Sequence, residues 1–428
     1  MLVCASCSSK NNWTKEEIRT QALREDGIFR KWTVSLLLLS AFGVAAAAAA
    51  DKQYGPGVSD AEIKIGQTMP YSGPLSVYGQ IGHAQQAYFA KINSEGGING
   101  RKINLISLDD GYMPPKALEQ VRRLVERDNV LLIFNSAGTA TNIVVREYLN
   151  SQKVPHLFVA GGDAAWGDYQ HYPWTIGWGS SYQAEGKLYA EHILANRPNA
   201  KIAVLSLNDD YGRDYVKGFK DGLGERASTM IVREQTYDIT DPTVDSQMVT
   251  LKASGADTFF AAVAGRQASQ AYRKSYDIDW RPQTYISVPG ASPEGILKAA
   301  GLKTAVGFTT AYYGMSPDIR TIRGHPAMQD YFEWAKKWFP KGNAEDGIVT
   351  YGYQVAQALE YVLRNCGDDL TRENIMQVAT HMDHVALPML YPGITATTSP
   401  TDYFALKQFQ MFRFTGEEWL PFGPIVGR

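Results

Sequence analysis

The feature that most constrains the fold is a regular alternation of short β-favouring runs with stretches of helical periodicity. The first run covers residues 63–68 and ends in a loop rich in proline and glycine. From Gly79, apolar side chains then recur on one helical stripe: Ile81, Ala84, Ala87, Tyr88 and Ile92. Because parallel strands need helical crossovers, the alternation predicts an α/β chain built from right-handed βαβ units.

The same rhythm continues in two series. In the first we expect strands at 102–108, 130–134 and 155–159 and helices at 116–127 and 139–149. In the second we expect strands at 202–206, 230–234, 258–262 and 284–288, and helices at 182–195, 214–223, 244–253 and 267–276. After the second series, we expect a strand at 306–312 that crosses back between the lobes. Helices at 326–338 and 347–364 and a strand at 411–414 follow.

An extended crossing at residues 171–181 separates the two series. We therefore predict two Rossmann-like lobes joined by extended crossings, with a cleft between them that can close over a ligand. Residues 51–177 plus 311–405 are expected to form the N-terminal lobe, and residues 178–310 plus 406–428 the C-terminal lobe.

The first fifty residues have the pattern of a secretory signal. Arg30 and Lys31 precede an apolar run from Val34 to Val44, and an alanine tract ends just before Asp51. The apolar run is short for a membrane span, so we expect cleavage and export to the periplasm, with the true start downstream of the first residues.

Composition and motifs exclude several functions. A net charge of −2 gives no reason to expect nucleic acid or an anionic membrane as partner. No phosphate loop, nucleophile elbow, zinc-protease motif or exported Cys-x-x-Cys pair occurs, so we expect no catalytic residues, no metal and no cofactor. His381 and His384 could share one helix face, but no further ligand clusters with them.

The strongest indication of a ligand site is Ala137-Gly138-Thr139 at the predicted start of a helix. Free N–H groups and the helix dipole favour an anion there, and a glycine lets the anion approach. Gly161 and Gly162 follow the next strand and should lie at the same sheet edge. The alternative is that Thr139 or Ser136 simply caps the helix.

Aromatic residues fall on loops and crossings around the same edge, where they could stack on an apolar ligand: Tyr78, Tyr112, Trp178, Tyr182 and Tyr211. Ordinary packing is the alternative for each of them. Arg266, just past a strand of the second series, could pair with a ligand carboxylate or stay in solvent.

Four segments together resemble periplasmic solute-binding proteins of the branched-chain amino-acid type: IKIGQTMPYSGPLSVYG, INSEGGINGRKI, the segment from Asp109 to Ala117, and NDDYGRDYVKGFKDGL. The resemblance implies the type I periplasmic binding protein fold with three hinge crossings. It also implies a monomer that binds a small molecule and serves a membrane ABC permease.

In that family the ligand carboxylate is held at positions matching Ala137–Thr139 and the Gly161–Gly162 loop, and tyrosines matching Tyr78 and Tyr211 line the cleft. A glutamate anchors the ligand ammonium where an ungapped alignment places Pro289, which carries no charge. The resemblance therefore favours a carboxylate without an α-amino group.

The segment Trp166–Trp178 resembles the branch of the family associated with aromatic acids. An amino acid or amide held by Glu185 is the alternative ligand. A receptor module or a hydrolase such as an amidase are the alternative functions.

Overall fold

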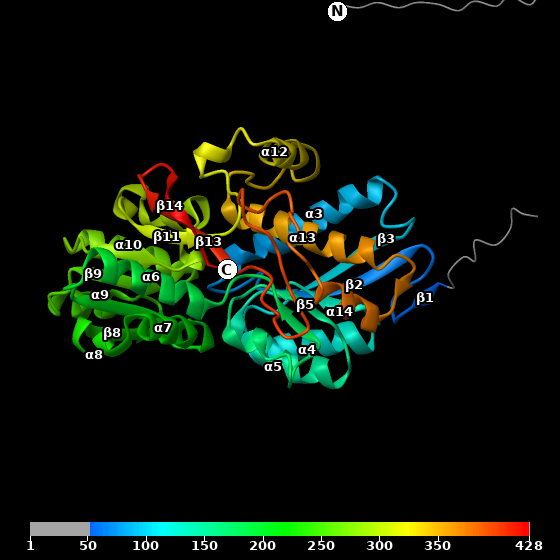
Figure 1. Ribbon diagram of the computed structural model, residues 1–428, viewed down its shortest axis with the longest axis horizontal. Helices are drawn as coiled ribbons and strands as arrows, with labels where there is room; N and C mark the ends of the chain where they lie inside the picture. Colours follow the sequence, from blue (N-terminus) through cyan, green and yellow to red (C-terminus); the bar gives the residue numbers. More distant parts are fainter. Residues whose placement is uncertain (1–51, 428) are drawn as a thin grey trace, which may run out of the picture. The chain divides into compact units, whose positions relative to one another are not determined.

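The computed structural model describes residues 52–427, so the predicted signal lies outside the described residues. Within residues 53–427 the chain forms two large sheets, each the centre of one lobe (Figure 1). The first lobe contains a five-stranded parallel sheet with strand order β3-β2-β4-β5-β6. Its strands are β2 (Glu62–Met69), β3 (Lys102–Asp109), β4 (Leu132–Phe134), β5 (His156–Val159) and β6 (Thr175–Gly177).

The second lobe contains a seven-stranded sheet with strand order β14-β13-β11-β10-β9-β7-β8. Its strands are β7 (Ile202–Leu207), β8 (Ile231–Tyr237), β9 (Thr258–Ala262), β10 (Gln283–Ile286), β11 (Thr309–Tyr312), β13 (Gln408–Phe414) and β14 (Trp419–Gly427). β7 to β11 are parallel, whereas β13 pairs antiparallel with β11 and β14 antiparallel with β13. A short pair, β1 (Gln53–Tyr54) and β12 (Asp369–Leu370), lies apart from both sheets.

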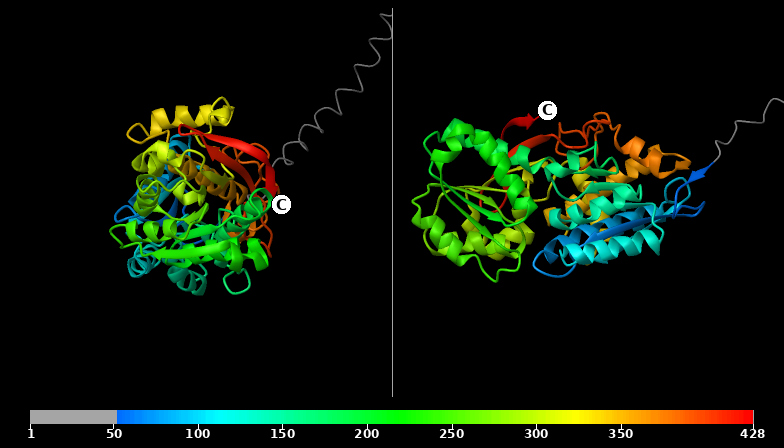
Figure 2. Two further views of the ribbon diagram at one scale, coloured as in Figure 1. Left: turned by 90° about the vertical axis from the view of Figure 1, so that its left-hand side faces the viewer. Right: turned by 90° about the horizontal axis from the view of Figure 1, so that it is seen from below.

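Helices accompany each sheet, and Figure 2 shows the two groups separated in a second view. In the first lobe they are α3 (Gly79–Ser94), α4 (Pro114–Glu126), α5 (Thr139–Ser151), α12 (Pro326–Trp338), α13 (Gly347–Asn365) and α14 (Arg372–Ala379). In the second lobe they are α6 (Tyr182–Asn196), α7 (Asp210–Leu223), α8 (Ala227–Met230), α9 (Asp245–Ala253), α10 (Gly265–Asp277) and α11 (Lys298–Ala300). Short helical turns also occur, among them η1 (Ser76–Tyr78) before α3, η2 (Ala164–Gly167) before β6 and η4 (Val288–Gly290) after β10.

The chain passes between the lobes three times, which confirms the expected fold class. It enters the second lobe between β6 and α6, leaves it after β11 towards α12 and α13, and returns to it at β13. The crossings are close together, since Gly177 pairs with Phe404 in an isolated bridge and Tyr391 N–H donates to Tyr313 O. Grouped crossings leave the cleft free to open and close by hinge motion.

Some elements differ from the sequence-based expectation. α7 begins at Asp210, not at residue 214, because the Asp209 carboxylate caps it by accepting the Gly212 N–H at 3.1 Å. The segment 306–312 is not itself a crossing, because β11 lies inside the second sheet. His381 and His384 do not share a helix face, since α14 ends at Ala379.

Candidate functional site

A cavity of about 210 Å³ lies between the lobes, at the carboxyl ends of strands from both sheets. This is the edge at which parallel α/β sheets bind ligands. Ten of the twelve predicted site residues line it: Tyr78, Tyr112, Ala137, Gly138, Thr139, Gly161, Gly162, Tyr182, Tyr211 and Pro289. Their role in binding stays a prediction.

The first-lobe wall of the cavity is the start of helix α5. Gly138 precedes the helix with a φ of 109°, a conformation that L side chains rarely adopt. A methyl group on Gly138 would meet the Tyr112 ring at 2.5 Å and Thr141 Oγ1 at 2.8 Å, so only glycine fits there. The start of the helix, whose first N–H groups have no partner within the helix, lines the cavity at Gly138 and Thr139.

Two buried hydroxyl groups in the cavity lining make no hydrogen bond of ordinary geometry among the described residues, although the first of them lies close enough to Tyr182 to oppose the rise that burial causes in the pKa of that phenol. They are Thr139 Oγ1 on the first turn of α5 and Ser180 Oγ in the first crossing. Their residues are only 2% and 5% exposed. Because buried polar groups are normally paired, these hydroxyls and the helix terminus form an incomplete site suited to a carboxylate.

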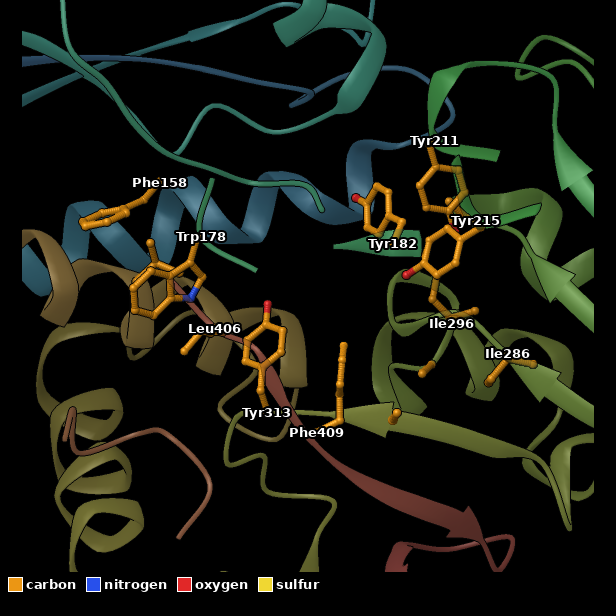
Figure 3. Packing of buried hydrophobic residues seen from close by; sticks show 14 of the residues in the cluster. Phe158, Trp178, Tyr182, Tyr211, Tyr215, Ile286, Ile296, Tyr313, Leu406 and Phe409 are labelled. Atoms are coloured by element: carbon orange, nitrogen blue, oxygen red, sulfur yellow. The ribbon is translucent and has the colours of Figure 1, made fainter. Parts of the chain in front are cut away.

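The second-lobe wall is built from tyrosines. Tyr182 stacks on Tyr215 with ring centroids 4.4 Å apart and meets Tyr211 edge-on at 5.2 Å, as Figure 3 shows. The Tyr211 hydroxyl lies 2.7 Å from Ser287 Oγ and donates to Val263 O at 3.1 Å. Burial raises the pKa of Tyr211 well above its usual value, so it stays neutral and offers an aromatic face.

The lobes are closed on each other through hydrogen bonds across the cleft. Tyr78 donates to Pro289 O at 2.7 Å, and Tyr112 donates to Asp209 Oδ2 at 2.7 Å. The backbone N–H of Ala164 donates to Asp214 Oδ2 at 3.0 Å. Tyr78 and Tyr112 thus contact the opposite lobe as well as the cavity.

Glu185, from helix α6, places a carboxyl group in the cavity wall. Its Oε1 accepts from the Tyr189 hydroxyl at 2.7 Å and the Val288 N–H at 3.0 Å, and its Oε2 accepts from the Tyr215 hydroxyl at 2.6 Å. Burial raises its pKa to about 7 despite these donors. The carboxyl is therefore largely engaged inside its own lobe.

Two predicted site residues lie elsewhere. Trp178 belongs to the core: its ring packs edge-on against Phe158 at 5.2 Å, and its Nε1 reaches Gln354 Oε1 at 3.5 Å. Figure 3 shows it beside Phe158, away from Tyr182 and Tyr211. Arg266 is exposed and outside the cavity lining, because it points back towards the Asp241 carbonyl, 3.4 Å away.

The sequence-based prediction missed a group of lining residues from the second crossing, helix α13 and the last strand: Tyr312, Tyr313, Ser316, Asp318, Tyr351 and Trp419. They lie at or after the end of β11, on α13 and at the start of β14, outside the strand-to-helix loops that the repeat predicted as the site.

At Pro289, the backbone carbonyl faces the first lobe, where it accepts a hydrogen bond from the Tyr78 hydroxyl. The turn Pro293-Glu294-Gly295 carries a glutamate five residues after Pro289, but Glu294 does not line the cavity. It pairs instead with Lys298 at 3.1 Å and accepts from Asn343 at 3.0 Å. The glutamate of this turn is therefore not placed to anchor a ligand ammonium in the closed cleft.

Comparison with known proteins identifies relatives. A family model described as periplasmic binding protein matches residues 62–413. Leu/Ile/Val-binding protein homolog 7 from Brucella abortus is 26% identical over 213 residues, 48% of this chain and 53% of that protein. The alignment thus spans about half the length of that relative.

Solved structures share the fold. A branched-chain amino acid ABC transporter protein from Thermus thermophilus with bound valine has a TM-score of 0.77 at 15% identity, covering 87% of this chain and 98% of that one. A solute-binding protein of an ABC transporter from Rhodopseudomonas palustris, in complex with 3,4-dihydroxy benzoic acid, has a TM-score of 0.71 at 19% identity, covering 86% and 98%. Among residues 52–427, no helix is long and apolar enough to cross a membrane.

Proposed function

The chain belongs to the family of periplasmic binding proteins, and we propose that it captures a small carboxylate in the periplasm and delivers it to a membrane ABC permease. The best candidate ligand is an aromatic acid such as a hydroxycinnamate or a benzoate. The protein would act as a monomer whose two lobes close over the ligand. Binding would be non-covalent, and the ligand would not be chemically changed.

One observation carries this proposal: two buried hydroxyls, Thr139 Oγ1 on the first turn of α5 and Ser180 Oγ in the first crossing, lack hydrogen-bond partners of ordinary geometry among the described residues and line a cavity walled by tyrosine rings. A carboxylate would complete the hydrogen bonds of the hydroxyls and meet the positive end of the α5 dipole. The body of an aromatic acid would contact Tyr182 and Tyr211. The dihydroxybenzoate complex of the Rhodopseudomonas protein supports the same ligand class.

An amino acid is the second candidate, because the Thermus protein binds valine and Glu185 places a carboxyl group in the cavity wall. Three donors of the protein already bind the Glu185 carboxyl, so it has less capacity to hold a ligand ammonium. This favours a ligand acid that has no amino group.

A thermal-shift screen of the protein from Asp51 onwards tests the proposal. Benzoates, hydroxycinnamates, leucine and valine are compared in parallel, since a ligand that binds only the folded state raises the melting temperature. We expect a rise with the aromatic acids alone. A rise with leucine or valine alone would overturn the ligand class and assign the ammonium another anchor.

A further inference from the structure

The cavity has a second set of unpartnered oxygen atoms, contributed by residues after strand β11. Ser316 is 5% exposed, and its Oγ lies close enough to the Asp318 carboxyl to oppose the rise that burial causes in the pKa of that group, but it makes no hydrogen bond of ordinary geometry among the described residues. Oδ1 of Asp318 likewise makes none there, although the main-chain carbonyl of Asp318 accepts from Trp419 N–H at 2.9 Å. Both side chains line the cavity. Burying such atoms unpaired costs free energy that a bound molecule can recover.

This second set lies at a different part of the cavity from Thr139 and Ser180. Ser316 packs against the start of α13, since a methyl group on Gly347 would lie 2.8 Å from Ser316 Oγ. A series of tyrosine rings connects the two regions: Tyr351 lies near Tyr182 on one side and near Tyr312 on the other, and Tyr312 lies near Asp318. The cavity therefore has two polar regions with aromatic surface between them.

The charges around Asp318 determine whether the charged or the uncharged end of a ligand can bind beside it. The carboxylates of Asp346 and Glu345 lie near it, and burial raises the pKa of Asp318 to about 7. Arg323 is nearby as well, but Glu345 binds its guanidinium at 2.6 and 2.8 Å. A ligand carboxylate is repelled from this region and directed to helix α5.

Because the proposed function places the carboxylate at α5, we infer that Asp318 and Ser316 form a second subsite for a hydroxyl group at the remote end of the ligand. A hydroxyl can donate to Asp318 Oδ1 and accept from the Ser316 hydroxyl, so it satisfies both atoms. The inferred ligand class is an aromatic acid with a hydroxyl group opposite its carboxylate.

Calorimetric titration with ligand pairs tests this subsite. The probes are 4-hydroxybenzoate, benzoate and 4-methoxybenzoate, together with 4-hydroxycinnamate and cinnamate as a longer pair. At about pH 8 Asp318 is mostly ionised and accepts only. We expect one hydroxy acid to bind about tenfold more tightly than its unsubstituted partner, and the methoxy acid, which lacks the donor, to lose that gain.

Variants assign the preference to the two residues. Asp318→Ala and Ser316→Ala should each reduce the ratio between the hydroxy acid and its partner to about twofold or less. Asp383→Ala, on a side chain that is 89% exposed, is the control and should keep the full ratio. Circular dichroism checks the fold, and Ser316→Ala keeps the test usable if Asp318→Ala does not fold.

The outcomes separate this inference from the proposed function. Equal affinity for the hydroxy and unsubstituted acids, or a full ratio in both variants, would overturn the subsite and leave aromatic-acid binding in place. If none of the five acids binds the wild-type protein, the proposed function is overturned, and the subsite with it.

Discussion

The hydroxyl of Tyr78 in the first lobe donates to the carbonyl of Pro289 in the second lobe, with 2.7 Å between the two oxygen atoms. The same hydroxyl accepts the backbone N–H of Gly265 at 3.1 Å. One phenol therefore bonds to two loops of the opposite lobe, and both bonds exist only when the cleft is closed. Burial raises the pKa of Tyr78 above its usual range, so the hydroxyl keeps the proton that it donates.

Tyr78→Phe should weaken ligand binding roughly tenfold, because closure then leaves the Pro289 carbonyl and the Gly265 N–H without their partner. Titration with the ligand found in the thermal-shift screen measures the change. Tyr148→Phe is the control, since its hydroxyl donates to Glu126 at 2.9 Å on an exposed surface. Equal affinities of the two variants would show that Tyr78 does not contribute to closure.

Gly138→Ala should abolish measurable binding, since the added methyl group would collide with the ring of Tyr112 and displace the start of α5. Gly96→Ala is a matched control: its φ is 103°, but a methyl group there meets nothing within 4 Å. Both variants carry similar backbone strain, of about 1 kcal/mol, in their unfolding free energy. Binding that survives in Gly138→Ala would place the ligand away from α5.

Glu185→Gln distinguishes the two candidate ligand classes. If the ligand is an acid without an amino group, its affinity should change less than about threefold, because Glu185 contacts its own lobe. If the ligand is an amino acid held by Glu185, affinity should fall by roughly a hundredfold, as expected for a lost charged partner. Titration measures both, and Glu191→Gln on the same helix, where the side chain is 57% exposed, is the control.

Ligand affinity should rise as the pH falls from about 8 to 6. Burial in the closed cleft raises the pKa of Asp163 to about 7, and Asp214 and Asp210 of the second lobe raise it further, while Arg146 opposes them. In an open cleft we expect an ordinary pKa near 4, so closure takes up a proton below pH 7 and becomes easier.

Titration at several pH values tests this linkage. Asp163→Asn keeps the cap, because its side-chain oxygen can still accept the Ala165 N–H that donates to Asp163 Oδ1 at 2.9 Å, and it should flatten the pH dependence. Asp168→Asn is the control because His171 holds the pKa of Asp168 below its usual value, outside the tested window. A pH dependence that persists in Asp163→Asn would assign the proton uptake to another carboxyl group.

The repeated units of the fold could be predicted because local periodicity specifies them. The helix at 326–338 was predicted with the bounds that α12 has, and β9 likewise. Strand β14 was missed because Pro421, Gly423 and Pro424 interrupt its pattern. Such residues are tolerated there because β14 is the edge strand of its sheet.

The site could be predicted only where it follows that repeat. Loops after parallel strands meet at one sheet edge, so Gly138 and Tyr211 were predicted at the cavity. The position of Arg266 depends on which way a side chain turns at the start of α10, and sequence spacing does not encode that. Ser316 and Asp318 lie in a crossing, where tertiary packing alone decides what faces the cavity.

The walls of the cavity come from positions as far apart as Pro70 and Trp419. A nascent chain therefore cannot assemble the chamber until the segment with β14 is available, however early the first βαβ units form. Contacts between residues so distant in sequence also form late, since long loops must close first. Ligand binding therefore requires almost the whole of the chain up to β14. A fragment that ends before Trp419 would lack part of the cavity wall.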